Sequence, residues 1–289
     1  MIDIIVPTYN RYDDVKKFIS EIKKQTFENY RVVIIDDHGD VNIKELVPNN
    51  DPRFVLHRLD ANKGQAFARN YAVDRSSAEY LIFLDDDAWF LSETALEDFY
   101  KFVNKNPNDA WMFDVIEPNK KPLSERVKTK TGEPLGEFIA CACAFNRKSF
   151  VEIGGFLPYF HSYGEETEMV IRMLLRRQEM VFLPEIKVFH NYNASGRSSV
   201  WQNRFLINSI RNEVYIIILH YPFVLIPFHL CGKYILRLVF IIMKSDKKIN
   251  SIIQTTKGFY SGIFNSRFFF KERKALNFSQ FRYWLSIRW

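Results

Sequence analysis

Three consecutive carboxylates, Asp85, Asp86 and Asp87, follow the apolar run 80–84. The run has the composition of a buried β-strand, so the acids are expected at its carboxyl end, where open α/β sheets bind their ligands. Bunched carboxylates repel one another unless a cation is present, and oxygen ligands suit Mg²⁺ or Mn²⁺. The cluster therefore predicts a divalent-metal site that faces a phosphorylated substrate. An acidic turn after a buried strand is the alternative, and the three acids alone do not decide between them.

Other polar residues follow the neighbouring predicted strands. Strands over 2–6, 31–35 and 53–59 alternate with helices over 13–25 and 64–75, which is the pattern of a doubly wound parallel sheet. The segments that follow these strands are Pro7-Thr8-Tyr9-Asn10-Arg11, Asp36-Asp37, and 62–64 with Arg69-Asn70. Parallel strands end at the same edge of a sheet, so these residues are expected to lie near the three aspartates.

The pattern is less regular in the second half. We expect a helix over 92–104 capped by Ser92, a strand over 111–116, a polar surface loop over 118–137 and a strand over 138–145. Further elements are a helix over 165–177, short strands over 180–183 and 187–190, and mainly helical structure from residue 201 onward. Cys141 and Cys143 lie on one face of the predicted strand and are interpreted as core residues. With only three cysteines, the chain predicts no disulfide framework and fits a reducing cytosol.

The charge is distributed unevenly along the 289 residues. Residues 196–289 contain fifteen Lys and Arg against three Asp and Glu, a net charge of +12, whereas the whole chain carries +6. Aromatic residues alternate with the cations, a mixture typical of segments that lie at a membrane surface. Stacking on single-stranded nucleic acid would use the same residues, but no nucleic-acid-binding motif accompanies them.

The apolar stretch 214–232 contains no Asp, Glu, Lys or Arg. It does contain Pro222 and Pro227, so we predict a helix that lies in the membrane interface or is buried in the protein, rather than one that spans the bilayer. The first residues predict a strand and no signal peptide.

In their order and spacing, the motifs resemble those of the family 2 glycosyltransferases with the GT-A fold. The matching segments are IIVPTYNR, VVIIDD, NKGQAFARN, FLDDDAW, GGF followed by GEETEMVIR, and VFH before ASGRSS, over about residues 2–200. RNEVY, and Lys257-Gly258 before Ser261-Gly262, are similar to the tails of members that act on lipid-linked bacterial polysaccharides, such as rhamnosyl- and galactofuranosyl-type transferases.

The resemblance implies a fold and a domain division. The fold would be a doubly wound, mostly parallel α/β sheet of the nucleotide-diphospho-sugar transferase type. Residues 1–200 would form the catalytic domain, with a nucleotide-sugar-binding half over 1–117 and an acceptor and catalytic half over 118–200. Residues 201–289 would form a helical, basic, membrane-associating extension.

Carried over residue by residue, the resemblance also implies a donor site. The base and ribose pocket would be lined by Pro7, Thr8, Tyr9, Asp36 and Asp37, with Arg69 reaching towards the donor and Asp86 touching the ribose or a metal-bound water. Mn²⁺ or Mg²⁺ would bridge the donor diphosphate and would be held by Asp85, Asp87 and His190, with Arg197 near the phosphates. A histidine after an apolar strand is otherwise a buried core residue, and this alternative stays open for His190.

The family's general base usually lies in a Glu-Asp pair at a helix start, and the matching pair here is Glu165-Glu166. We interpret Glu166 as the base, which must reach the acceptor hydroxyl directly or through one water, and Glu165 and Glu168 as supporting residues. Without the resemblance, these acids would be interpreted as stabilising the helix dipole, with Glu168 and Arg172 as an i,i+4 ion pair.

The sequence thus predicts an inverting, metal-dependent glycosyltransferase of cell-surface polysaccharide synthesis. It would move a sugar from a nucleotide-diphosphate donor to a saccharide acceptor, expected to be lipid-linked, from a peripheral position on the cytoplasmic face of a bacterial membrane. A soluble or protein acceptor is the alternative within this class, with the tail then forming a homodimer interface. Two alternatives come from other classes. One is a haloacid-dehalogenase-like phosphatase, but Ala88-Trp89 after the acids does not fit the motif of those enzymes. The other is a non-catalytic nucleotide-sugar-binding protein.

Overall fold

One eight-stranded sheet, in the order β3-β2-β1-β4-β7-β6-β8-β5, forms the centre of the protein. The computed structural model describes residues 1–160, 163–192, 199–245 and 247–288. The strands are β1 (Ile2–Thr8), β2 (Tyr30–Asp36), β3 (Phe54–Arg58), β4 (Tyr80–Leu84), β5 (Ala88–Phe90), β6 (Ala110–Ile116), β7 (Ala142–Asn146) and β8 (Met180–His190). The helices are α1 (Tyr12–Ile22), α2 (Gln65–Val73), α3 (Ala95–Lys105), α4 (Leu123–Arg126), α5 (Arg147–Ile153), α6 (Glu165–Leu175), α7 (Ser199–His220), α8 (Ile226–Lys244), α9 (Lys248–Phe269) and α10 (Phe278–Ser286).

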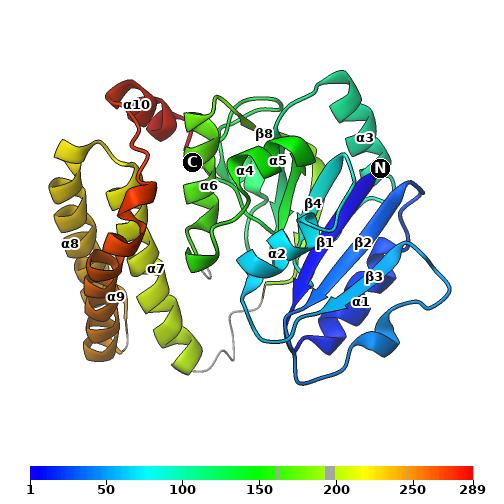
Figure 1. Cartoon of the computed structure of the whole chain (residues 1–289), viewed down its shortest axis with the longest axis horizontal. Coiled ribbons are helices and arrows are strands. Elements are labelled where there is room, and N and C mark those ends of the chain that lie inside the picture. Colours follow the sequence, from blue (N-terminus) through cyan, green and yellow to red (C-terminus); the bar gives the residue numbers. More distant parts are fainter. Residues whose placement is uncertain (161–162, 193–198, 246, 289) are drawn as a thin grey trace.

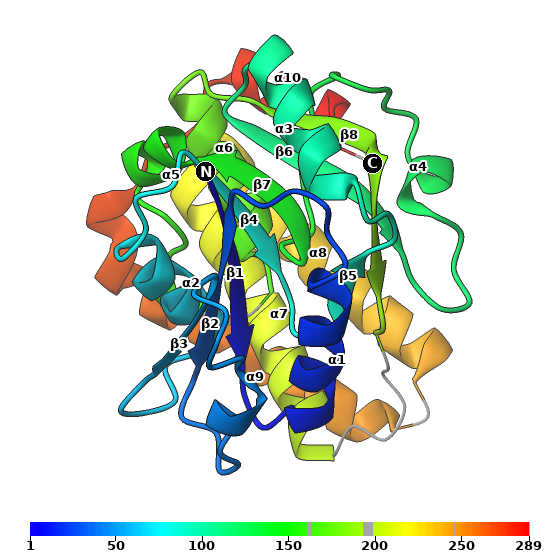
Figure 2. The same ribbon diagram turned by 90° about the vertical axis from the view of Figure 1, so that its right-hand side faces the viewer.

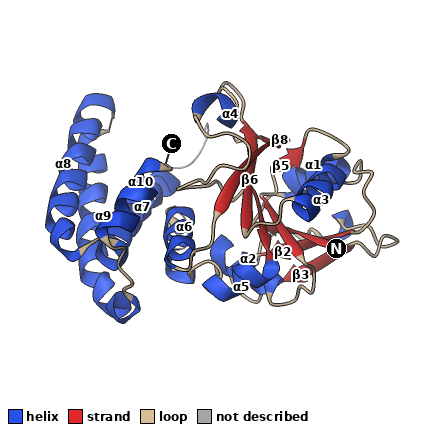
Figure 3. Cartoon of the chain, turned by 90° about the horizontal axis from the view of Figure 1, so that it is seen from above, coloured by secondary structure: helices blue, strands red, loops and turns tan. Residues whose placement is uncertain are grey.

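Helices cover both faces of the sheet (Figure 3). Helices α1 and α3 lie on one face, and α2, α5 and α6 lie on the other. Every residue of β1 and β4 is buried, as expected for strands that are covered on both sides. Helix α1 shows how a surface helix fits this arrangement, because Val15, Phe18, Ile19 and Ile22 form its buried stripe.

The strand pairing confirms the expected α/β class. Strands β3, β2, β1 and β4 are parallel neighbours, and β6 is parallel to β8. Strand β7 lies between β4 and β6 and is antiparallel to both, and β5 is antiparallel to β8. The sheet is therefore mixed, with its parallel half formed by the first part of the chain.

Several predicted boundaries are wrong. The two short strands over 180–183 and 187–190 are one strand, β8, whose register with β6 shifts between Phe113 and Asp114. The strand over 138–145 begins only at Ala142. The N-cap of α3 is Thr94 rather than Ser92, whose hydroxyl lies 2.9 Å from that of Thr94.

The C-terminal helices form a layer beside the sheet. Figure 1 shows α7, α8 and α9 together at one side of the molecule, and in Figure 3 α8 lies farthest from the sheet. Figure 2, turned by 90°, shows the same helices behind the strands. Helices α7 and α9 approach closely because small residues of α9 are buried between them; these are Ser251, Thr255, Gly258, Gly262 and Ser266.

The apolar stretch 214–232 does not form one helix, so that prediction is wrong. Helix α7 ends at His220, and α8 begins at Ile226, with Pro227 in its first turn. Pro222 lies in the connection, where a proline cannot continue a helix because it lacks the backbone N–H. Residues Val214 to His220 are buried against the rest of the protein, whereas the segment Phe223–Lys244 is long and apolar enough to cross a membrane and only 6% of its apolar window is buried.

The end of the chain packs back onto the first 200 residues. The indole N–H of the fully buried Trp284 donates to the carbonyl oxygen of Gly136 at 2.9 Å, and Arg288 pairs with Glu137 at 2.8 Å. A Cβ on Gly136 would lie 2.9 Å from the carbonyl oxygen of Trp284, so only glycine fits this contact. The described part of residues 201–289 is therefore in close contact with the sheet domain, and the predicted boundary at residue 200 stays a prediction.

Candidate functional site

Parallel registration brings the predicted donor residues to one edge of the sheet. Thr8 pairs with Asp36 at the ends of β1 and β2, and β4, which pairs with β1, leads directly into Asp85. The hydroxyl of Thr8 donates to Oδ2 of Asp86 at 2.6 Å. The expectation that these segments meet at the carboxyl edge agrees with this geometry.

Arg11 binds two of the three adjacent aspartates. Its guanidinium lies 3.0 Å from Oδ1 of Asp86 and 2.6 Å from Oδ2 of Asp87, and its Nε also bonds Asp14. Burial raises the pKa of Asp86 to about 8, even though the charge of Arg11 and the hydrogen bond from Thr8 act in the opposite direction. Arg11 thus supplies positive charge at the position where the sequence predicts a metal ion.

Asp87 also contacts the predicted metal ligand His190. Nε2 of His190 lies 3.4 Å from Oδ1 of Asp87, because β5 pairs with β8 so that Ala88 is opposite His190. Burial opposes ionisation of Asp87, but His190 and Arg11 outweigh it and lower the pKa of this carboxyl. Burial of His190 acts to lower the pKa of its imidazole. The hydrogen bond and the charge of Asp87 outweigh burial, so the pKa of His190 is raised.

Asp85 lies between an arginine and a cysteine. Nη2 of Arg69 donates to Oδ1 of Asp85 at 2.7 Å. Leu84 pairs with Ala142 in antiparallel β4 and β7, so the next residues, Asp85 and Cys141, face each other. Ligand atoms of Asp85, Cys141 and His190 all lie within 4.8 Å of one another.

This group fits a divalent cation. Nδ1 of His190 is buried without a hydrogen-bond partner among the described residues, and Glu117 lies 3.8 Å from it. Carboxylate and imidazole ligands suit Mn²⁺, whereas a thiol suits softer ions. Burial raises the pKa of the Cys141 thiol well above its ordinary value, so the carboxylates and the imidazole are the better ligands for a hard ion.

The residues predicted for the base and ribose pocket are mostly engaged in hydrogen bonds of the fold. Oδ2 of Asp36 accepts from Arg58 at 2.5 Å. The two carboxylate oxygens of Asp37 accept from the backbone N–H groups of Lys63 and Gly64, and burial raises the pKa of Asp37. Pro7 is buried, and Tyr9 is exposed at this edge. Tyr9 and the NKG turn held by Asp37 are therefore the accessible parts of the predicted pocket.

The acidic pair at the start of α6 lies close to Arg69. Glu165 is buried, and its Oε1 accepts from Gln65 at 2.8 Å, while its Oε2 has no hydrogen-bond partner within the described chain. Burial raises the pKa of both Glu165 and Glu166, and the charge of Glu165 adds to the effect on Glu166. Arg69, only 1% exposed, acts electrostatically on this pair and hydrogen bonds Asp85, so it links the two acidic groups.

Glu168 holds the helices together. Its carboxylate accepts both bonds from Nε of Arg172 at 2.7 and 2.8 Å, and Oε1 lies 3.1 Å from Nε2 of His220 on α7. Arg172 in turn donates to the carbonyl oxygens of Ile153 and Gly155. The i,i+4 pair expected from the sequence is present, and it fixes α6 to α7 and to the turn after α5.

Sequence reasoning placed Arg11 in the segment at this edge but gave it no role, and it did not place Cys141 in the site. Arg11 lies in the IIVPTYNR motif, three residues after Thr8, and that adjacency was the signal for its role. Cys141 was interpreted as core, which its burial confirms, but its place opposite Asp85 depends on strand pairing that the sequence does not show. Arg197 lies outside the described residues.

Known proteins are similar in sequence to part of the chain. The family model for Glycosyl transferase family 2 matches residues 3–167. An uncharacterized glycosyltransferase of Haemophilus influenzae is 28% identical over 198 residues, which is 64% of each chain. The Escherichia coli enzyme UDP-Glc:alpha-D-GlcNAc-diphosphoundecaprenol beta-1,3-glucosyltransferase WfgD is 31% identical over 99 residues, 34% of this chain and 39% of that one. The matches thus span less than two thirds of the length of these relatives.

Solved structures share the fold. GalNAc-T7 with UDP, GalNAc and Mn²⁺ superposes with a TM-score of 0.64 at 16% identity, covering 91% of this chain and 56% of that chain. The mannosyltransferase PcManGT from Pyrobaculum calidifontis, in complex with GDP-Man and Mn²⁺, has a TM-score of 0.61 at 14% identity, covering 95% and 76%. The GT-A architecture expected from the sequence is confirmed.

Proposed function

The chain belongs to glycosyl transferase family 2, and we propose that it transfers a sugar, with inversion, from a nucleotide-diphosphate donor to a hydroxyl of a saccharide acceptor. The observation that carries the proposal is the meeting of Asp85, Asp87 and His190 at the carboxyl edge of the sheet, with the pair Glu165-Glu166 connected to them through Arg69. This arrangement supports a donor site and a base on the two sides of one arginine as the proposed assignment.

Asp85, Asp87 and His190 are the residues we propose to hold Mn²⁺ or Mg²⁺. The ion would neutralise the charge that develops on the donor diphosphate as the sugar leaves. Two structural neighbours were crystallised with Mn²⁺. For Asp87 to serve as a ligand, Arg11 has to leave it, and the released guanidinium is then available to the donor phosphates.

Glu166 is the residue that we propose to remove the proton from the acceptor hydroxyl. Its raised pKa favours a carboxylate that accepts a proton near neutral pH, as a general base requires. Gln65 positions Glu165 by donating a hydrogen bond to its carboxylate, and the charge of Arg69 compensates part of the negative charge of the Glu165-Glu166 pair. The hydroxyl oxygen then attacks the anomeric carbon directly, and no covalent intermediate with the enzyme is needed.

A lipid-linked saccharide is the acceptor class that we favour. WfgD, by its name, acts on a sugar joined to diphosphoundecaprenol. Helix α8 of this chain carries large apolar side chains that are exposed, among them Phe228 at 75%. Together with the +12 charge of residues 196–289, this face supports binding to the surface of an anionic membrane from the cytoplasmic side.

A panel of nucleotide sugars tests the donor assignment. A ligand that binds the folded state raises the melting temperature, and we expect one UDP-, GDP- or dTDP-sugar to do so strongly only when Mn²⁺ or Mg²⁺ is present. The stabilising donor should then release nucleoside diphosphate in the presence of acceptor, with inverted configuration at the new bond as measured by NMR. A product of retained configuration would contradict the mechanism, and a melting temperature insensitive to every donor would contradict the function.

A further inference from the structure

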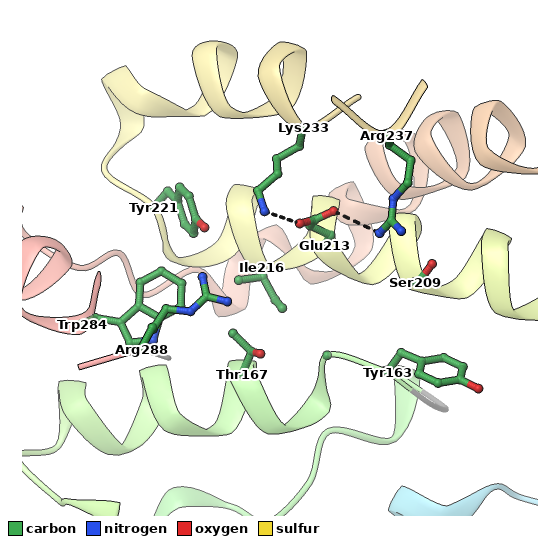
Figure 4. A pocket seen from close by; sticks show the side chains of 11 residues that line it. Tyr163, Thr167, Ser209, Glu213, Ile216, Tyr221, Lys233, Arg237, Trp284 and Arg288 are labelled. Atoms are coloured by element: carbon green, nitrogen blue, oxygen red, sulfur yellow. Dashed lines mark ion pairs between the residues drawn. The ribbon is translucent and has the colours of Figure 1, made fainter. Parts of the chain in front are cut away.

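A cavity of about 190 Å³ lies where α6, α7, α8 and α10 meet (Figure 4). Its wall carries Lys233 and Arg237 from α8, Arg288 beyond α10, Glu213 from α7 and Thr167 from α6. Figure 4 shows Lys233 and Arg237 directed at Glu213 from above, and Thr167 rising from α6 below. The cavity is separate from the donor edge of the sheet.

The wall of this cavity suits an anion. Among the described residues of its lining there are three cationic side chains and one acidic side chain, that of Glu213. Glu213 pairs with Lys233 at 2.7 Å but with Arg237 only at 3.8 Å, beyond hydrogen-bond distance. Arg288 is paired with Glu137, which lies outside the wall. Lysine and arginine side chains that converge in this way, with the hydroxyl of Thr167 opposite them, are the donors that bind phosphate groups in proteins.

One helical turn separates the cavity from the donor site. Gly164, the N-cap residue of α6, and Thr167 in its first turn belong to the cavity wall. Glu165 of the same turn bonds Gln65 on α2, on the side of Arg69 and Asp85. Glu166, between these residues in sequence, acts electrostatically on Arg69 and Cys143, so it belongs to the donor side of the same turn. A molecule anchored in the cavity would therefore lie against the helical turn that carries the proposed base.

The cavity is also next to the apolar outer face of α8. Lys233 and Arg237, one turn apart, point into the cavity, while Phe228, Leu236 and Phe240 on the same helix are exposed. A ligand with a charged group and a long apolar chain could therefore place the charge in the cavity and the chain along the surface of α8.

We propose that this cavity binds the phosphate of the lipid-linked acceptor, with Lys233, Arg237 and Arg288 as its ligands. The inference rests on the proposed function and adds to it the place where the acceptor binds: the phosphate or diphosphate that joins saccharide and lipid would lie in this cavity. Glu213 pairs with Lys233 until the phosphate arrives, so that it acts as a competing anion.

Calorimetry with farnesyl diphosphate tests the cavity, with farnesol and inorganic pyrophosphate as comparison ligands and EDTA present to exclude metal-dependent binding at the donor site. We expect farnesyl diphosphate to bind more tightly than either. Lys233→Gln and Arg237→Gln should each weaken it by roughly tenfold, the scale of one lost hydrogen bond to a charged group. Glu213→Gln should strengthen binding, an effect that damage to the fold would not produce. Lys244→Gln, at an exposed lysine of the same helix, is the control.

Three results would overturn the assignment: farnesol binding as tightly as the diphosphate, weaker binding in Glu213→Gln, or equal losses in Lys244→Gln and Lys233→Gln. Inorganic pyrophosphate binding as tightly as farnesyl diphosphate would overturn the lipid-linked source. Binding of nucleoside diphosphate with Mn²⁺, measured on the same variants, tests the donor site separately. If that binding is intact and farnesyl diphosphate does not bind, the cavity assignment fails while the proposed function stands. The reverse result removes the proposed function and leaves the cavity as a site for a lipid diphosphate that is not a sugar acceptor.

Discussion

Two arginines stabilise the carboxylates at the donor edge of this protein. Arg69 is buried and contacts Asp85, whereas Arg11 is partly exposed and contacts Asp86 and Asp87. A buried arginine cannot leave without exposing an unpaired charge to an apolar interior, so Arg69 is a permanent partner. Arg11 can exchange its carboxylates for phosphate oxygens, so it is the arginine that we expect to respond to the donor.

Arg11→Met should change metal and nucleotide binding in opposite directions. Removing the guanidinium frees Asp87, so Mn²⁺ should bind more tightly in the absence of nucleotide, while the affinity for nucleoside diphosphate with Mn²⁺ should fall by roughly tenfold because a phosphate contact is lost. Electron paramagnetic resonance of free Mn²⁺ and calorimetry of the nucleotide measure the two effects. Parallel changes in both affinities would show that Arg11 only supports the fold.

Asp87→Asn should remove the metal-dependent part of nucleoside diphosphate binding. Loss of residues that merely orient a metal ligand commonly costs 10- to 100-fold in affinity, so loss of a ligand is expected to cost about 100-fold or more. Asp74→Asn is the matched control, because Asp74 is exposed and lies at the C-terminal end of α2. Calorimetry with and without Mn²⁺ gives the result, and an unchanged metal effect in Asp87→Asn would refute the assignment.

Glu166→Gln should retain donor binding and lose transfer by roughly 10²- to 10⁴-fold, the usual scale for a general base. The pKa of Glu166 is raised, so the ionised form is lost as pH falls at values where an exposed glutamate would still be charged. Wild-type kcat/KM should therefore decline on the acid side with an apparent pKa above the ordinary value, which belongs to the pair with Glu165. The residual activity of Glu166→Gln should lack this decline. A normal profile in Glu166→Gln, with the loss in Glu165→Gln instead, would assign the base to Glu165.

At the scale of helices and strands, local sequence patterns predicted most of the first half. The alternation of apolar strands and amphipathic helices up to Leu84 reproduces β1 to β4 with errors of one or two residues at the ends. The insertion of antiparallel β7 between β4 and β6 was not predictable, since pairing between distant strands leaves no periodic signal in either one. The candidate site follows the same division: the acids at strand ends were found, and Cys141, placed by β7, was not.

The break between α7 and α8 could have been predicted. Pro222 and Pro227 are present in the sequence, and both mark the connection. The absence of charge over 214–232 favoured one continuous helix, although this stretch contains two environments. Its first part is buried in the protein, and its second part begins the exposed face of α8.

Glycine-to-alanine substitutions at Gly258, in the contact between α7 and α9, and at Gly232, on α8, should change the free energy of unfolding in opposite directions. A Cβ on Gly258 would lie 2.2 Å from Cγ2 of Ile210, whereas a Cβ on Gly232 of α8 meets no atom within 4 Å. Gly→Ala within a helix ordinarily stabilises by about 1 kcal/mol, so Gly232→Ala should raise the free energy of unfolding. Gly258→Ala should lower it, because overpacking costs about 1–3 kcal/mol. Urea unfolding measures both, and stabilisation by Gly258→Ala would show that the two helices are not packed this closely.

At the scale of the whole molecule, the basic and apolar C-terminal helices predict binding to anionic vesicles. Deleting the chain from Val214 onward is a poor test, because Val214 to His220 and Trp284 are part of the buried core. Substitution on the outer face of α8 is better suited. Phe228→Ser with Phe240→Ser removes two exposed rings, each contributing about 1.5–3 kcal/mol when buried in an apolar phase, and should reduce binding by more than tenfold.

Sedimentation with vesicles of anionic and neutral lipid measures this binding. The wild-type chain should bind anionic vesicles less at high salt, because its +12 tail is attracted to the headgroups. Val41→Ser with Leu91→Ser, at two exposed apolar side chains outside the C-terminal helices, is a control that leaves α8 intact. If the α8 variant sediments like the wild type, the exposed face serves a protein contact instead.

The helices form successive layers on the sheet: α6 lies against it, α7 and α9 follow, and α8 is outermost (Figure 3). This layering has a consequence for the length of the acceptor. The small residues of α9 and the network of Glu168, Arg172 and His220 join the C-terminal helices through packed side chains to α6, the helix that bears Glu166. An enzyme bound to a bilayer through α8 would hold its transfer site at a fixed distance from the membrane surface. It would then select acceptors by the number of sugars between lipid and hydroxyl, and glycosylate saccharides of one size while leaving shorter and longer ones unmodified.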